Sequence, residues 1–248
     1  MKVLKFGGGL NSTALLIECT KRGIIFDLIT FADTGGELPE TMRHVKRMSQ
    51  WCIQNGQPPI TIVWYVNRAG ERVTLESNCL KKKMLPSLAY GYKKCSLRFK
   101  AYPQEKLLNS HPLAKKTWEH KKKVVCFYGI DADEPHRKRQ DTTKYRNVYP
   151  LIEWDIGRHE CGEISENELG YRPGKSSCFF CPAMKKKEIT DLREQHPQLF
   201  RRAIAMEKNA NLHSLKGLGR YFSWEHYQSA ICRQVPLFDE MLPCHCTD

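Results

Sequence analysis

The chain has 248 residues, which is enough for one sizeable α/β domain with a smaller module attached. No apolar run approaches the roughly 18 residues of a membrane span, so we expect no membrane association. Eleven cysteines without a secretory apolar core at Lys2–Phe6 indicate a reducing, cytoplasmic setting. In that setting cysteines serve as thiols, metal ligands or catalysts in preference to disulfides.

The net charge of +13 is concentrated in short clusters. Any single cluster is usually a solvated face, but six along one chain favour a polyanionic partner, nucleic acid above all. ATP alone would not need so many. The clusters are Lys81–Lys83, Lys93–Lys94, Lys115–Lys116, Lys121–Lys123, Arg137–Arg139 and Lys185–Lys187.

The first predicted elements are a short strand at Lys2–Phe6 and a helix that includes Thr13–Cys19. Glycine lets main-chain amides approach a ligand closely, and the N-terminus of a helix favours an anion. The pattern therefore predicts a phosphate-binding loop, with a plain strand-to-helix turn as the alternative. The loop contains Gly7, Gly8, Gly9, Asn11, Ser12 and Thr13.

A second buried strand is predicted at Phe26–Ala32, a helix at Glu40–Asn55 and a third strand at Ile60–Val66. This alternation predicts parallel strands with crossover helices, whose ligands lie beyond the carboxyl ends of the strands. The turn after the second strand would then lie beside the glycine loop. Its polar and glycine residues are Asp33, Thr34, Gly35 and Glu37, and Asp33 could instead simply cap the turn.

The rest of this half is less regular. Arg68–Lys94 lacks periodicity, and we expect a partly ordered basic segment that covers the strand ends. A fourth strand is predicted at Val124–Tyr128, and Val148–Trp154 is predicted to be a short extended piece that closes the core.

From about Asp155 the chain becomes cysteine-rich, with two helices predicted at Lys185–Gln195 and Pro197–Asn209. A Cys-x-x-Cys pair suits a redox dithiol, a zinc site or a 4Fe-4S cluster, and spacing alone cannot choose among them. The candidate ligands are Cys161, Cys178, Cys181, Cys244 and Cys246, with Cys232 as a further possibility for the fourth.

Four segments resemble motifs of the phosphoadenosine phosphosulfate (PAPS) reductase family. The first is similar to the PP-loop Ser-Gly-Gly-x-Asp-Ser of enzymes that split ATP between its α- and β-phosphates, with Gly7 in place of Ser and Asn11 in place of Asp. Phe31–Thr41 resembles the Asp-Thr-Gly…Pro-Glu-Thr segment, and residues 94–108 resemble a Cys…Arg-x-Lys…Pro segment. The loop from Gly129 resembles Gly-Ile-Arg-Ala-Asp-Glu-Ser, with Asp131 in place of Arg.

The resemblance implies a Rossmann-like α/β fold of the HUP, or adenine nucleotide alpha-hydrolase-like, type. It has a parallel sheet with helices on both faces over residues 1–154 and a small Cys-rich, mostly helical metal-binding module over 155–248. It also implies ATP and Mg²⁺ as cofactors, with the glycine loop and Asp33–Glu37 holding the nucleotide. The adenylate would activate a DNA or tRNA atom for sulfur transfer, with sulfur supplied by a donor such as a cysteine desulfurase. The implied catalytic residues are Asp33, Arg98, Lys100, Arg137 and Arg139.

The spacing of Cys161, Cys178 and Cys181 is similar to that of the cluster-binding region in two branches of the PAPS reductase family, those of DNA phosphorothioation and sulfate reduction. This resemblance implies a 4Fe-4S cluster, with Zn²⁺ as the alternative. Two other functions stay open. One is a reductase of PAPS or adenylyl sulfate, with Cys244 or Cys246 as the nucleophile. The other is a non-catalytic nucleic-acid-binding subunit, because Asn11 lacks the charge of the usual Asp.

Overall fold

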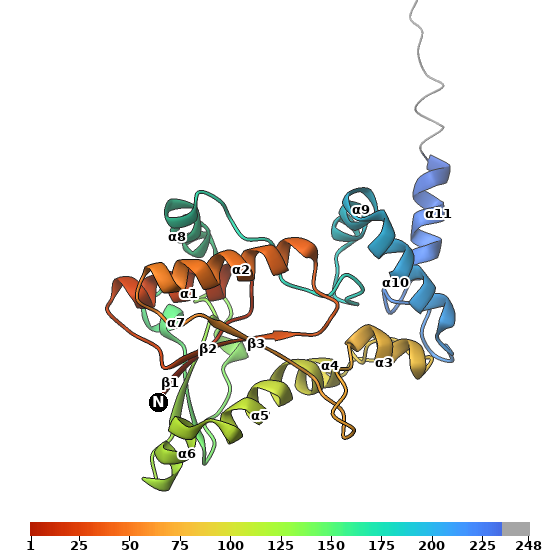
Figure 1. Cartoon of the computed structure of the whole chain (residues 1–248). Helices are drawn as coiled ribbons and strands as arrows, with labels where there is room; N and C mark the ends of the chain where they lie inside the picture. The colour runs from red at the N-terminus through yellow and green to blue at the C-terminus, as the bar shows by residue number, and fades with distance from the viewer. Residues whose placement is uncertain (235–248) are drawn as a thin grey trace, which may run out of the picture. The chain divides into compact units, whose positions relative to one another are not determined.

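The computed structural model, which describes residues 1–234, contains a five-stranded parallel sheet (Figure 1). The strand order is β3-β2-β1-β4-β5, and every neighbouring pair is parallel. This confirms the predicted fold class. The order reverses between β1 and β4, and loops beyond the carboxyl ends of strands at such a point form the usual ligand crevice. The strands are β1 (Lys2–Lys5), β2 (Leu28–Asp33), β3 (Ile60–Trp64), β4 (Val124–Tyr128) and β5 (Tyr145–Val148).

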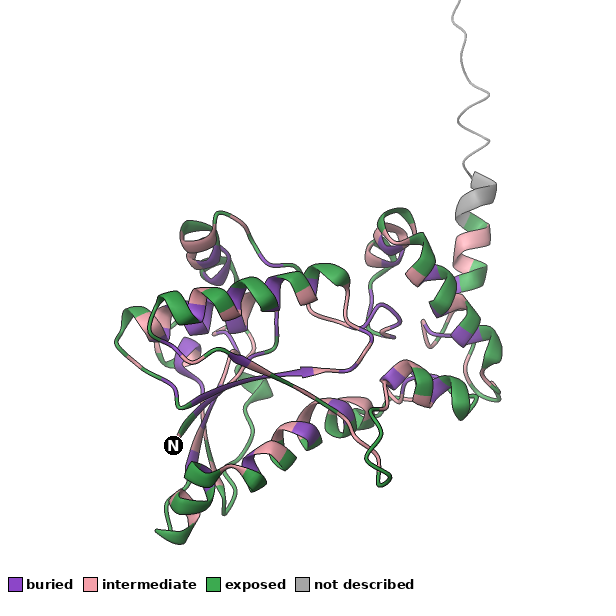
Figure 2. Ribbon diagram, viewed as in Figure 1, coloured by how far each residue is buried: buried purple, intermediate pink, exposed green. Residues whose placement is uncertain are grey.

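Helices cover both faces of the sheet (Figure 1). On one face, α1 (Leu10–Lys21), α2 (Pro39–Gln54) and α8 (Arg158–Leu169) enclose the main apolar core, which includes Leu4 and Phe31. On the other face, α5 (Tyr102–Ser110) and α6 (Pro112–Glu119) pack on a second cluster. Buried residues line the sheet and the inner sides of these helices (Figure 2). A strand buried on both faces needs a continuous apolar run, and β2 has one.

One predicted element was wrong. Val148–Trp154 does not form a single extended piece, because only Val148 belongs to β5, while Pro150–Glu153 forms the helical turn α7. Pro150 occupies the first helical position, where its missing N–H and fixed φ are tolerated. The remaining short elements are α4 (Lys94–Ser96), a π-helical turn (Leu97–Ala101) and a 3₁₀ turn (Pro135–Arg137).

The chain forms two compact units, and their boundaries differ from the expected division after residue 154. The first unit comprises Met1–Thr74 and Ser96–Cys178, so α8 belongs to it because α8 packs on α1. The second unit comprises Leu75–Cys95 and the chain from Phe179. Its helices are α3 (Leu75–Lys81), α9 (Lys186–Gln195), α10 (Pro197–Asn209) and α11 (Trp224–Gln234), and α9 and α10 confirm the two predicted helices.

Long-range polar contacts order the second unit, so the expectation of a merely partly ordered segment at Arg68–Lys94 was wrong for α3. Arg202 of α10 donates to Glu76 of α3 at 2.9 Å, and Asn209 Nδ2 donates to the Leu80 carbonyl at 2.9 Å. The buried carboxylate of Glu207 accepts the backbone N–H groups of Leu218 and Trp224, at 2.7 and 3.0 Å. Glu207 thereby fixes the start of α11.

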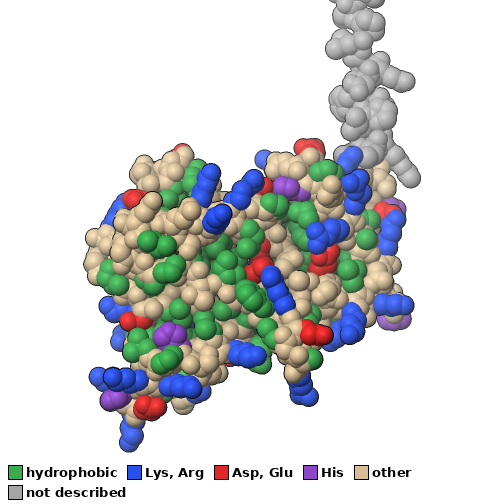
Figure 3. Space-filling view, viewed as in Figure 1, with side chains coloured by type: hydrophobic (Ala, Val, Ile, Leu, Met, Phe, Trp, Pro, Cys, Tyr) green, Lys and Arg blue, Asp and Glu red, His purple; other side chains and the backbone are tan. Residues whose placement is uncertain are grey.

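All six predicted basic clusters are exposed. On the face shown in Figure 3, Lys and Arg side chains gather at the lower left, over α6 and the turn that follows it. Among residues 1–234, no helix combines the length and the apolar character that crossing a bilayer requires.

Candidate functional site

The glycine loop joins β1 to α1 and leaves the first amides of the helix without acceptors. The first backbone bond of α1 runs from the Thr13 N–H to the Gly9 carbonyl at 3.1 Å. The preceding amides, those of Leu10, Asn11 and Ser12, have no intrahelical acceptor, as at any helix start. These N–H groups and the helix dipole favour an anion. Phosphate binding at these amides stays a prediction.

Two glycines in the loops after β1 and β4 let the backbone pack closely against neighbouring elements. Gly8 has φ +73°, and a Cβ there would lie 2.8 Å from the Phe31 ring. Gly129 follows β4, and a Cβ there would lie 2.7 Å from the backbone nitrogen of Ser12. Only glycine permits these approaches. The first turn of α1 consequently packs against the loop after β4.

That packing pairs Asn11 of the predicted loop with Asp131, which the sequence did not single out as functional. Asn11 Nδ2 donates to Asp131 Oδ2 at 2.6 Å. Asp131 is 1% exposed, and no donor within residues 1–234 reaches the buried Oδ1 atom of either side chain. Burial raises the pKa of Asp131, the bond from Asn11 opposes this shift, and the carboxylates of Glu134 and Asp133 add to it. Oxygen atoms without donors suit a hard cation such as Mg²⁺.

Asp33 is already engaged on both oxygens. Its Oδ1 accepts the Gly35 N–H at 2.7 Å, and its Oδ2 accepts a hydrogen bond from Arg72 Nη2 at 2.6 Å. The Arg72 guanidinium also lies 4.8 Å from the centroid of the Trp64 ring. The bond to Gly35 is the turn-capping arrangement that the sequence allowed as the alternative for Asp33. Arg72 carried no sequence signal and enters the site only through this ion pair.

The same loop holds a buried acid and a cysteine. Glu37, with its side chain 1% exposed, pairs with Lys100 at 3.3 Å, and it accepts the Thr34 hydroxyl at 3.1 Å. The Thr34 oxygen lies 3.1 Å from Cys178 Sγ. Because Thr34 has one hydroxyl hydrogen and gives it to Glu37, the Cys178 thiol is the donor in that contact. The structure thus places Cys178 on the predicted nucleotide loop.

Two hydroxyls of the predicted phosphate-binding loop form hydrogen bonds within the protein. Ser12 Oγ donates to the Gly9 carbonyl at 3.0 Å. Thr13 is fully buried, and its Oγ1 contacts the Gly9 carbonyl at 2.9 Å and His44 Nε2 at 2.8 Å. Burial, aided by Arg47, lowers the pKa of His44 to about 4. Thr13 does not fit the expected role of a phosphate contact.

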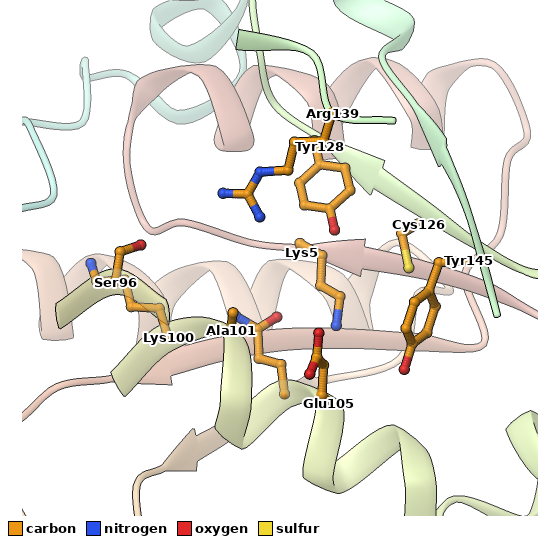
Figure 4. Close-up of a pocket in the computed structure, with 10 residues that line it drawn as sticks. Lys5, Ser96, Lys100, Ala101, Glu105, Cys126, Tyr128, Arg139 and Tyr145 are labelled. Carbon is orange, nitrogen blue, oxygen red and sulfur yellow. The ribbon is translucent and has the colours of Figure 1, made fainter. Parts of the chain in front are cut away.

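The four predicted catalytic cations occupy separate places. Arg98 donates to the Tyr65 hydroxyl at 2.9 Å, and Arg137 pairs with Glu134. Lys100 and Arg139 line a cavity of about 140 Å³ beside α5 (Figure 4). The structure therefore does not gather all four around the glycine loop.

The predicted metal ligands are not assembled in the described part of the chain, where no group of three or more His, Cys, Asp or Glu side chains fits a metal ion. Cys161 is fully buried in the apolar core, and burial raises the pKa of its thiol to about 12. A metal ion has to displace the proton from such a thiol before it binds, so the role of Cys161 as a ligand stays a prediction. Cys178 and Cys181 stay predicted metal ligands. The structure does not describe the side chains of Cys232, Cys244 and Cys246.

Comparison with known proteins finds only low sequence identity to the two proteins described below. No protein-family model matches the chain. An uncharacterized protein of Methanocaldococcus jannaschii is 25% identical over 245 residues, which is 90% of this chain and 46% of the archaeal protein. The chain spans about half the length of that relative. The solved U34-tRNA thiolase NcsA of Methanococcus maripaludis, with its 4Fe-4S cluster, is similar at a TM-score of 0.43 and 14% identity, over 93% of this chain and 80% of the thiolase.

Proposed function

We propose that the chain binds ATP with magnesium beyond β1 and β4 and cleaves it between the α- and β-phosphates. The adenylate would activate a nucleic-acid atom for sulfur insertion. One observation carries this proposal: free amides of a helix start adjoin two oxygens without donors, at the reversal of strand order. The amides suit phosphate, and the oxygens suit the cation that accompanies it.

The residues have distinct proposed roles. The amides of Leu10, Asn11 and Ser12 bind the pyrophosphate portion, and Gly8 lets them approach it. Asn11 Oδ1 and Asp131 Oδ1 hold Mg²⁺, which when bound neutralises phosphate charge. Asp33 orients the Arg72 guanidinium at the end of β2, where a fixed cation stabilises charge that develops on the leaving phosphate.

The sulfur and nucleic-acid parts of the proposal depend on other features. Cys178 contacts Thr34 of the loop after β2, and this contact supports a role for its sulfur atom beside the proposed nucleotide. Exposed lysines over α6 supply the positive surface that a nucleic-acid backbone needs. A sulfur-donor protein such as a cysteine desulfurase would be the partner. A metal centre at Cys178 and Cys181 stays a prediction, and no step is assigned to it.

The test is pyrophosphate release from ATP and Mg²⁺, with and without tRNA or DNA. We expect release in the wild type and none with Gly8→Ala. Gly23→Ala is the matched control, because Gly23 also has positive φ, at +69°, but open space around it. ATP binding without turnover would favour the non-catalytic subunit. Sulfite formation from PAPS would favour the reductase.

A further inference from the structure

The sheet face beneath α5 carries a lysine where the strand pattern calls for an apolar residue. Val3 pairs with Cys126 and Lys5 with Tyr128 in the register of β1 and β4. Val3 and Cys126 belong to the cluster under α5 and α6. Because side chains alternate along a strand, Lys5 and Tyr128 point to the same face. Lys5 therefore faces α5, away from α1 and α2.

Lys5 forms no ion pair within residues 1–234. No carboxylate among residues 1–234 lies within 4.0 Å of its ammonium group. Burial lowers the pKa of Lys5, while Cys126 and Glu105 act in the opposite direction. Burying an ammonium group without a partner is costly, and such a cost is usually retained for binding.

The ammonium group opens into the α5 cavity, the space of about 140 Å³ between the sheet and α5. Figure 4 shows Lys5 extending from β1 toward Glu105, with Tyr128 and Arg139 on one side of it and Tyr145 on the other. Arg139 likewise has no carboxylate within 4.0 Å in the described residues. The cavity thus combines two unpaired cations with two tyrosines.

Basic side chains outnumber acidic ones in the lining of the cavity. Burial raises the pKa of Tyr145 to about 12 and also raises the pKa of Tyr128, so both hydroxyls stay protonated and can donate. Burial also raises the pKa of the Cys126 thiol, which stays neutral. Glu105 is the acidic residue of the lining, and it is exposed. The lining holds Lys5, Lys100 and Arg139 against one exposed carboxylate, and Lys100 is paired with Glu37. An anion in the cavity would favour the charged form of Lys5.

Size restricts the ligand further. A cavity of about 150 Å³ accommodates benzene, whereas drug-sized ligands occupy at least about 300 Å³. We propose that the α5 cavity binds a small tetrahedral oxyanion, of sulfate or phosphate size, between Lys5 and Arg139 with help from the tyrosine hydroxyls. This site lies on the face of the sheet opposite to α1. It does not depend on the proposed ATP cleavage.

The test is calorimetric titration of the full chain with sodium sulfate at constant ionic strength. We expect Lys5→Met to weaken sulfate binding at least tenfold. Lys2→Met should leave it unchanged, because Lys2 is an exposed lysine on the same strand. Tyr145→Phe should weaken binding severalfold, and Glu105→Gln should strengthen it.

Circular dichroism confirms that each variant is folded. Equal sulfate affinity in the wild type, Lys5→Met and Tyr145→Phe would overturn the proposal. A repeat with ATP separates two sources of the oxyanion. If saturating sulfate leaves the Kd of ATP unchanged, the site takes a free anion. If sulfate raises that Kd in the wild type but not in Lys5→Met, the site takes a phosphate of the nucleotide.

Discussion

The Asn11–Asp131 pair gives the sharpest test of the proposed site. Asn11→Asp would place two carboxylates where the present donor and acceptor are 2.6 Å apart. With charge centres about 4 Å apart and an effective dielectric constant of about 20, their repulsion is about 4 kcal/mol. Protonating one carboxyl at pH 7 instead costs a similar amount, since each pH unit corresponds to about 1.4 kcal/mol. We expect Asn11→Asp to lower the free energy of unfolding by about 2–4 kcal/mol.

The exchange variant Asn11→Asp/Asp131→Asn is the decisive comparison. It restores one carboxylate and one amide, so we expect its free energy of unfolding to return to within about 1 kcal/mol of the wild type. Asp131→Asn alone removes the charged magnesium ligand. We expect it to weaken binding of ATP with Mg²⁺ by about 10–100-fold, the range that loss of a metal-site partner causes.

Urea denaturation gives the stabilities, and calorimetry with ATP and Mg²⁺ gives the affinities. ATP without Mg²⁺ is the control, because Asp131→Asn should leave that affinity unchanged or increase it. Wild-type stability in Asn11→Asp would refute the geometry of the pair. Unchanged affinity for ATP with Mg²⁺ in Asp131→Asn would remove Asp131 from the cation site.

Three further predictions concern the supporting structure. The pKa of His44 is about 4 in the folded chain and about 6.5 in the unfolded chain. As pH falls from 6.5 toward 4, the unfolded chain binds the proton first, and the free energy of unfolding decreases. By pH 5 the wild type should lose about 2 kcal/mol of unfolding free energy relative to its loss in His44→Gln, and equal losses would contradict a neutral buried His44. Cys161→Ala should leave bound iron or zinc unchanged by elemental analysis whereas Cys178→Ala removes it, and metal loss in Cys161→Ala would identify Cys161 as a ligand. Glu207→Gln should destabilise the protein by about 2–4 kcal/mol in urea, because buried donors such as the Trp224 N–H lose a charged acceptor, and a wild-type midpoint would refute this capping role.

Local patterns predicted much of the fold because they depend on neighbours in sequence. The apolar run of β2 and the glycines after β1 fix a buried strand and a tight loop wherever they occur. The prediction of an extended piece at Val148–Trp154 was wrong because Pro150 favours the start of a helix as readily as a break in a strand. The unit boundary differs from the expected one after Trp154 because α8 packs on α1. That contact joins segments far apart in the sequence, so no local pattern indicates it.

The sequence by itself determined four of the five strands and the helices α1, α2, α9 and α10, since backbone preference and side-chain period act over a few residues, but it did not indicate β5 or α8. Only the tertiary structure decided that β4 lies beside β1. Because of this pairing, Asn11 contacts Asp131 and the Lys5 side chain lines the α5 cavity. Such pairings depend on which buried surfaces fit together across more than a hundred residues. No local pattern in either segment encodes that fit.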